Sequence, residues 1–222
     1  MQREQMTPPY YQRQIKKLVQ QVTGVFLFYS RAVDSKILIA LSVIVSEQAT
    51  PIENTMKKCI FLYYTASQEE AILTYTKSDM VLAIHSDVSY LSESKSRSRA
   101  GGHWFMAGNA EIPANNGEVM NVSQIIKAVM SSAAEAELGA LFVNFKLAVP
   151  ARKTLEELGH PQPNTPMQTD NSTANRLLNN KIIPKATKII DMKFHWMRCR
   201  DVQGQFRFYW RPGIQNWVTC RM

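Results

Sequence analysis

Apolar residues recur at steps of three and four along the first part of the chain. Within residues 12–30 they fall on one side of a helix, and the same spacing predicts a second helix over residues 36–47. A third helix is predicted from Pro51 to about residue 67. Proline fits the first turn of a helix, because the N–H that it lacks would have no partner there. We therefore expect a small helical unit over residues 1–70, without an evident catalytic cluster.

The pattern changes at residue 71, where short segments rich in β-branched and aromatic residues replace the helical spacing. Strands are predicted at residues 72–75 and 80–87, in a segment that ends at Met106, within 118–130, at 167–170 and at 205–210, with a polar loop over 92–98. A long helix is predicted from about Ser132, and Pro150 is expected to kink or end it. Shorter helices are predicted at 171–179 and 189–200. Residues 71–222 are therefore expected to form an α/β domain with a mixed sheet and flanking helices.

Composition narrows the classes of protein that fit. The 222 residues are 45% hydrophobic, which suits one full domain and a smaller piece, and no apolar run is long enough to predict a membrane span. The start of the chain is polar and proline-containing, which does not resemble a signal peptide. The three cysteines lie far apart with no histidine at ligand spacing, so neither a disulfide framework nor a zinc site is expected. An intracellular, reducing location is the prediction.

The positive charge is concentrated at one end of the chain. Residues 181–222 contain nine basic and two acidic residues, which accounts for +7 of the total net charge of +8. Such a segment is typical of a surface that faces nucleic acid, since each neutralised phosphate releases a counterion. A solvated surface that only keeps the protein soluble would look the same.

Three acidic residues stand where predicted strands and helices meet. Asp87 ends a strand, Glu137 lies in the first turns of the long helix, and Asp170 ends the strand of residues 167–170. Carboxylates at such positions can converge on one edge of a sheet and present hard oxygen ligands to Mg²⁺ or Mn²⁺. Two such ions about 4 Å apart would hold both the attacking water and the leaving oxygen of a phosphodiester. A single strand-end aspartate is more often a turn former, but three in this order favour a site.

Four short blocks then resemble the RNase H domains of Ty1/copia retrotransposons. Residues 85–87 (His-Ser-Asp), 131–138 (Ser-Ser-Ala-Ala-Glu-Ala-Glu-Leu) and 169–174 (Thr-Asp-Asn-Ser-Thr-Ala) resemble three motifs of that family, and residues 188–195 resemble the block before its last strand. Upstream, residues 20–41 and 55–64 are similar to the thumb and connection segment that ends the copia reverse transcriptase. The resemblance implies the end of a Pol polyprotein: a helical segment, residues 1–70, before an RNase H-like domain with a mixed five-stranded sheet, residues 71–222.

The resemblance also implies roles for individual residues. Asp87, Glu137 and Asp170 match the family's metal-binding catalytic acids, and the implied substrate is an RNA–DNA hybrid. Glu135 lies about 200° around the helix from Glu137, so both cannot face one metal ion. The residues expected to contact nucleic acid are Arg97, Arg99, Asn171, Ser172, Lys185, Lys188, His195 and Arg198. Helix capping by Asn171 and Ser172, a solvated hairpin around Arg97 and Arg99, and packing of His195 are the alternatives.

The chain departs from the family pattern near its end. Residues 211–216 resemble the approach to a fourth carboxylate, which the family places after an apolar residue and an alanine. Here the sequence continues with Trp217 and Val218, and no acid follows Asp201. We therefore expect the last helix to be missing and two-metal hydrolysis to be impaired.

Several functions remain open on the sequence alone. The paired polymerase carboxylates are not present, so DNA synthesis by this chain is excluded. A catalytically dead remnant that still binds nucleic acid is the main alternative to a nuclease. An integrase-like nuclease is less favoured, because the acids occur in the order Asp, Glu, Asp and no zinc module precedes them. The expected partners are nucleic acid and the rest of the Pol polyprotein, not a membrane, in the cytoplasm within a virus-like particle or in the nucleus.

Overall fold

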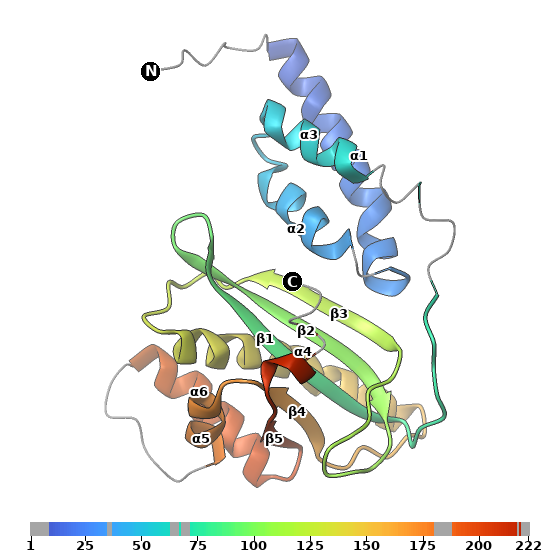
Figure 1. Ribbon diagram of the computed structural model, residues 1–222, viewed down its shortest axis with the longest axis vertical. Coiled ribbons are helices and arrows are strands. Elements are labelled where there is room, and N and C mark those ends of the chain that lie inside the picture. The colour runs from blue at the N-terminus through green and yellow to red at the C-terminus, as the bar shows by residue number, and fades with distance from the viewer. Residues whose placement is uncertain are drawn as a thin grey trace. The chain divides into compact units, whose positions relative to one another are not determined.

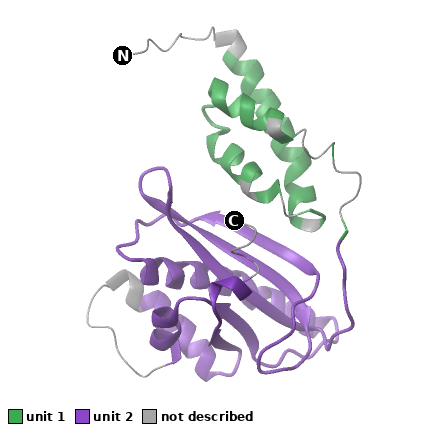
Figure 2. Ribbon diagram, in the orientation of Figure 1, with its two compact units in different colours: residues 1–72 green, residues 73–222 purple. Residues whose placement is uncertain are grey.

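The chain folds into two units, residues 1–72 and 73–222 (Figure 2). A computed structural model describes residues 9–34, 37–62, 67, 72–179, 188–216 and 218. Within these residues no helix has both the length and the apolar character needed to cross a membrane.

The first unit is helical. It contains α1 (Pro9–Ala32), α2 (Leu38–Glu47) and α3 (Glu53–Phe61) (Figure 1). Val19 of α1 and Leu41 and Ile44 of α2 are fully buried in its core, which is what the one-sided apolar spacing of these helices requires. Helix α3 begins at Glu53, and residues 63–66 of the predicted third helix lie outside the described residues.

The second unit is built on a mixed five-stranded sheet, as the sequence predicted. Its strands are β1 (Val81–Glu93), β2 (Arg97–Ala107), β3 (Glu118–Ile125), β4 (Thr165–Thr169) and β5 (Phe206–Trp210), in the order β3-β2-β1-β4-β5. Neighbouring strands are antiparallel from β1 to β3, whereas β4 is parallel to both β1 and β5. The parallel pairs place the carboxyl ends of β1 and β4 at the same edge of the sheet.

Three helices form a shared core with one face of this sheet: α4 (Ala133–Glu157), α5 (Ser172–Asn179) and α6 (Lys188–Val202) (Figure 1). Phe145 of α4 lies at the centre of the core and is fully buried. Its ring centroid is 4.1 Å from that of Phe206 on β5 and 4.9 Å from that of Trp196 on α6. These contacts join α4 to α6 and β5 in one core.

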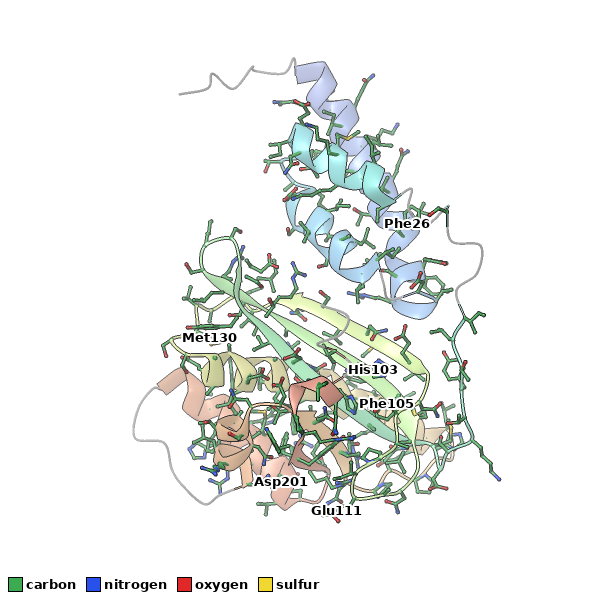
Figure 3. All side chains as sticks on the ribbon, viewed as in Figure 1. Phe26, His103, Phe105, Glu111, Met130 and Asp201 are labelled. Carbon is green, nitrogen blue, oxygen red and sulfur yellow. The ribbon has the colours of Figure 1, made fainter. Side chains whose placement is uncertain are left out.

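The opposite face of the sheet carries buried polar residues. His103, His85 and Gln168 are neighbours in register across β2, β1 and β4. The ring of Phe105 lies 5.0 Å from that of His85 and 5.3 Å from that of His103 (Figure 3 labels Phe105 and His103). Burial, followed by the charges of His103 and Arg211, lowers the pKa of His85 to about 3. The His85 ring is therefore neutral at pH 7.

Two segments that were predicted as strands lie outside the sheet. Residues 72–75 form no strand. The Tyr75 side chain links them to β3 instead, because its hydroxyl donates to the Glu118 carbonyl over 2.9 Å. Strand β3 ends at Ile125. Ile126 and Met130 then pack against the first turns of α4, so that part of the prediction was wrong (Figure 3 labels Met130).

Two other local predictions were wrong in part. Most of the predicted polar loop over residues 92–98 is strand, because Glu93 pairs with Arg97 and only a three-residue turn over 94–96, with positive φ at Lys95 and Ser96, joins the strands. Pro150 does not end the long helix, which continues to Glu157. The turns beyond Pro150 are retained because Leu155 packs against the core and Arg152 makes buried hydrogen bonds.

Arg152 anchors the connection before β4. Its guanidinium donates to the carbonyls of Gln162 (2.8 Å) and Pro163 (2.6 Å) and to the Thr165 hydroxyl (2.6 Å). Arg152→Met should lower the free energy of unfolding by about 1–3 kcal/mol, because these acceptors would lose a charged donor. Urea unfolding would measure the change. Lys153→Met is the matched control, since its ion pair with Glu157 is exposed and its loss should cost less than about 0.5 kcal/mol.

A candidate metal centre at the end of the sheet

Three carboxylates meet where β1 and β4 stop pairing. The two strands are in register at Ile84 with Met167 and at His85 with Gln168. Beyond this point Asp87 continues along β1, and Asp170 follows the end of β4. Glu137, in the second turn of α4, supplies the third group, and one ligand oxygen from each residue lies within 4.8 Å of the other two. The structure therefore brings together the three acids that the sequence singled out.

The electrostatics of this cluster favour a bound cation. Glu137 is 5% exposed, and burial, together with the charges of Asp87 and Asp170, raises its pKa to about 9. Burial also raises the pKa of Asp170. Glu137 therefore holds a proton at neutral pH when no cation is present, because three ionised carboxylates this close repel one another. A divalent cation could replace that proton, and an all-oxygen donor set suits Mg²⁺ or Mn²⁺.

Short hydrogen-bonded contacts orient the acids. The Asp87 carboxylate accepts a bond of 2.8 Å from the backbone N–H of Val88. The Thr169 hydroxyl lies 3.5 Å from the Glu137 carboxylate and accepts a 3.2 Å bond from the N–H of Asn171. Thr169 therefore links the end of β4 to both α4 and the start of α5.

Glu135 has a different task from Glu137. Its carboxylate accepts a 2.7 Å bond from the N–H of Ser131, and its own N–H donates to the Ser132 hydroxyl over 3.2 Å. Ser132 thus caps α4 by satisfying an N–H that has no partner within the helix, while the Glu135 side chain binds the residue before that cap. The prediction that Glu135 does not share a metal ion with Glu137 agrees with this geometry.

The segment after β5 completes the surroundings of the site. The apolar neighbours of Trp210 in the sequence predict a place in the core, but Trp210 is 45% exposed, so that prediction was wrong, and its indole donates to the Asp170 carbonyl over 2.8 Å. A Cβ on Gly213 would lie 2.9 Å from an Asp170 carboxylate oxygen, which favours glycine there. Asn216 is buried and donates to the Ser86 carbonyl over 3.1 Å. Spacing in the sequence does not indicate these contacts, because they depend on how β5 lies beside β4.

The four residues near the sheet that were predicted to contact nucleic acid differ in their exposure and in their hydrogen-bond partners. Arg97 is bonded within its own hairpin, to the Ser94 carbonyl at 3.0 Å. The expectation for Arg99 does not fit its position: its side chain is 4% exposed and pairs with Glu93 at 2.6 Å. The side chain of Asn171 caps α5 by accepting a bond from Ala174, whereas Ser172 is exposed.

The predicted contacts on α6 are partly open to solvent. His195 is exposed, not packed, and the Arg198 guanidinium lies 5.4 Å from the centroid of the Phe194 ring. Lys185 and the side chain of Lys188 lie outside the described residues. His195 and Arg198 are thus placed where a ligand can reach them.

Comparisons with known proteins identify solved structures with a similar fold, but no related family or protein by sequence. No family model and no curated protein matches the chain. Solved structures do match. The foamy viral protease–reverse transcriptase in complex with an RNA/DNA hybrid aligns over 92% of this chain with a TM-score of 0.53 and 10% identity. An RNase H1 isolated from compost covers 62% (TM-score 0.45, 14% identity), as does the N-terminal RNase H domain of Rv2228c from Mycobacterium tuberculosis (0.39, 16%). The second unit, a mixed five-stranded sheet with flanking helices, is thus similar to RNase H domains among other solved structures.

The extent of these matches differs. The chain spans 27% of the foamy viral structure, 88% of the compost RNase H1 and 86% of the mycobacterial protein. At such low identity the likeness establishes the fold alone. In the second unit, the three carboxylates lie where the pairing of β1 with β4 ends.

Proposed function

We propose that the chain is the end of a retroelement Pol polyprotein of the Ty1/copia type, and that its RNase H-like domain hydrolyses the RNA strand of an RNA–DNA hybrid. In this proposal Asp87, Glu137 and Asp170 hold Mg²⁺ or Mn²⁺. The observation that carries it is the convergence of these three carboxylates, within 4.8 Å, in an RNase H-like fold. The four sequence blocks that resemble the Ty1/copia family support it.

The chemistry is the addition of water across a P–O3′ bond, which leaves a 3′-hydroxyl and a 5′-phosphate. A bound divalent cation would supply an activated water and stabilise the charge that develops on the phosphate. Three carboxylates of the chain would hold that cation: Asp87 from β1, Asp170 from the end of β4 and Glu137 from α4. Glu137 would give up its proton when the cation binds, because the cation removes the repulsion that raises its pKa.

The substrate surface in this proposal lies near the carboxylates and on α6. Ser172, at the exposed start of α5, follows Asp170 by two residues and is placed for a phosphate contact. His195 and Arg198 would contribute from α6, with Lys185 and Lys188 before and at its start. Arg97 would contact the backbone from the β1–β2 turn, and Arg99 is left out because it is buried.

We propose that the first unit is the thumb and connection end of the reverse transcriptase. The alignment with the foamy viral enzyme over 92% of the chain is compatible with that assignment. The unit would then position the hybrid and not synthesise DNA.

One observation favours a second function. At residues 217–219 the chain has Trp, Val and Thr, where the Ty1/copia pattern places an apolar residue, an alanine and the fourth carboxylate. A domain with three acids would hold one cation more readily than two, which would slow hydrolysis. The alternative is therefore a nucleic-acid-binding domain without turnover.

A cleavage assay on the whole chain separates these functions. A hybrid labelled on its RNA strand is incubated with the protein over a range of Mg²⁺ and Mn²⁺ concentrations, with EDTA, single-stranded RNA and duplex DNA as controls. The nuclease predicts metal-dependent cleavage of the hybrid alone, with 3′-hydroxyl products. Salt-sensitive hybrid binding without cleavage at any metal concentration would support the binding function instead. Absence of both would contradict both proposals.

A further inference from the structure

Strand β1 loses its partner on one side just before Asp87. The described register of β1 with β4 ends at His85 and Gln168, so no backbone pairing with β4 is shown for Ser86 or Asp87. On the other side, β1 still pairs with β2, through Ser86 with Gly102. The position of Asp87 relative to Asp170 and Glu137 therefore depends on contacts other than the β1–β4 ladder.

Asn144 makes the first of these contacts. It is fully buried on α4 and lies seven residues after Glu137, which is two helical turns and hence the same side of the helix. Its amide nitrogen lies 3.1 Å from the Ser86 hydroxyl and 2.8 Å from the Gly101 carbonyl. Its oxygen accepts a 3.0 Å bond from the indole of Trp104. Asn144 thus joins the side of α4 that carries Glu137 to the strand that carries Asp87.

The close approach of β2 to this amide requires a glycine. A Cβ on Gly102 would lie 1.9 Å from the side-chain oxygen of Asn144. Gly102 is the register partner of Ser86, so Asn144 packs on the face of the sheet over both β1 and β2. Its position in the core is therefore closely defined.

Asn216 makes the second contact, from the segment that follows β5. It is also fully buried, and its amide nitrogen donates to the Ser86 carbonyl over 3.1 Å. Its own N–H donates to the Gly213 carbonyl over 2.8 Å, and Gly213 lies against the carboxylate of Asp170. Asn216 therefore connects the residue before Asp87 to the segment that borders Asp170.

We propose that Asn144 and Asn216 are positioning residues that hold Ser86 from two sides and so set the separation of Asp87 from Glu137 and Asp170. This inference rests on the proposed metal site. Asn144 defines the distance between α4 and β1, and Asn216 replaces the β1–β4 ladder where it ends. Metal–ligand distances tolerate changes of only about 0.2 Å, so a small displacement of Asp87 should weaken cation binding.

The test is the affinity of the purified full chain for Mn²⁺ alone, measured by electron paramagnetic resonance of free Mn²⁺. Asn144→Leu and Asn216→Leu should each bind Mn²⁺ about 10–100-fold more weakly, the scale of changes that orient metal ligands. Ser86→Ala, which removes only the hydroxyl that Asn144 contacts, should weaken binding less and keeps the test decisive if a leucine variant does not fold.

Gln162→Leu is the matched control. Gln162 is another buried amide, which donates to the Met80 carbonyl over 2.8 Å and accepts from the N–H of Leu82 over 3.0 Å, near the other end of β1. Its loss should lower stability but leave Mn²⁺ affinity at the wild-type value. Equal affinities in all the variants, or equal weakening in Gln162→Leu, would overturn the inference. If the wild-type chain binds no Mn²⁺, the proposed metal site itself fails.

Discussion

Asp170→Asn should reduce metal-dependent cleavage of an RNA–DNA hybrid by well over the roughly 100-fold that changes beside metal ligands can cause. Asparagine keeps the size of the side chain but removes the negative charge that a divalent cation requires. The contact of Trp210 with the Asp170 backbone carbonyl is independent of the side chain, so the local structure should persist. Initial rates of cleavage at saturating Mg²⁺, together with hybrid affinity, would measure the effect.

Asp79→Asn is the control for this substitution. Asp79 precedes β1 at the end of the strand remote from the carboxylates, and its carboxylate accepts a 2.8 Å bond from the N–H of Asn109. The same chemical change there should leave the cleavage rate within about twofold, the range of an ordinary surface substitution. Retention of wild-type cleavage by Asp170→Asn would contradict a role for that carboxylate in the reaction.

The metal-free protein should become less stable as pH rises from about 5 to about 9. In the unfolded chain Glu137 ionises near its ordinary pKa of 4.5, whereas in the folded state it keeps its proton up to about pH 9. Between these values the unfolded state binds fewer protons than the folded state, so the free energy of unfolding falls with increasing pH. The loss should be on the order of 3 kcal/mol by pH 7.

Glu137→Gln should remove most of this dependence and stabilise the metal-free protein at neutral pH. Glutamine is uncharged in both states, so its burial carries no proton linkage. Urea unfolding in EDTA across this pH range would measure the difference, with the exposed Glu157→Gln as a control that should retain the wild-type profile. A wild-type stability that rises over this range would contradict a protonated Glu137.

The same linkage predicts how Mg²⁺ binding responds to pH. Since the cation displaces the proton of Glu137, affinity should increase by roughly tenfold per pH unit below pH 9 for one proton released. Calorimetric titrations in buffers of different ionisation enthalpy would count that proton.

The acids of the candidate site could be predicted because each lies near a boundary between elements that the sequence pattern predicts. Asp87 closes the strand predicted at residues 80–87, although β1 continues to Glu93, and Asp170 follows the end of β4. Glu137 follows a capping signal at Ser131 and Ser132. Parallel neighbours expose their carboxyl ends at the same edge, so residues at those ends converge even though they are far apart in the chain. This reasoning requires the order of elements but not their precise packing.

Other residues could not be predicted, because their role depends on neighbours that are distant in sequence. Arg99 was expected to face phosphate, but β2 places it beside Glu93 across the hairpin. Trp210 was expected in the core, yet it lies at the end of β5, where its indole reaches the Asp170 carbonyl. Pro150 carries a local signal to end a helix, and the packing of the following turn outweighs it.

The sequence by itself determined the alternation of helical and extended segments, the mixed sheet and the three acids at its edge, because these follow from local periodicity and from the ends of elements. Only the tertiary structure decided which side chains hold those acids in place. Asn144, Asn216 and Gly102 acquire their roles through contacts between α4, β1, β2 and the segment after β5. Such contacts are set by close packing in three dimensions, which leaves no periodic trace along the chain.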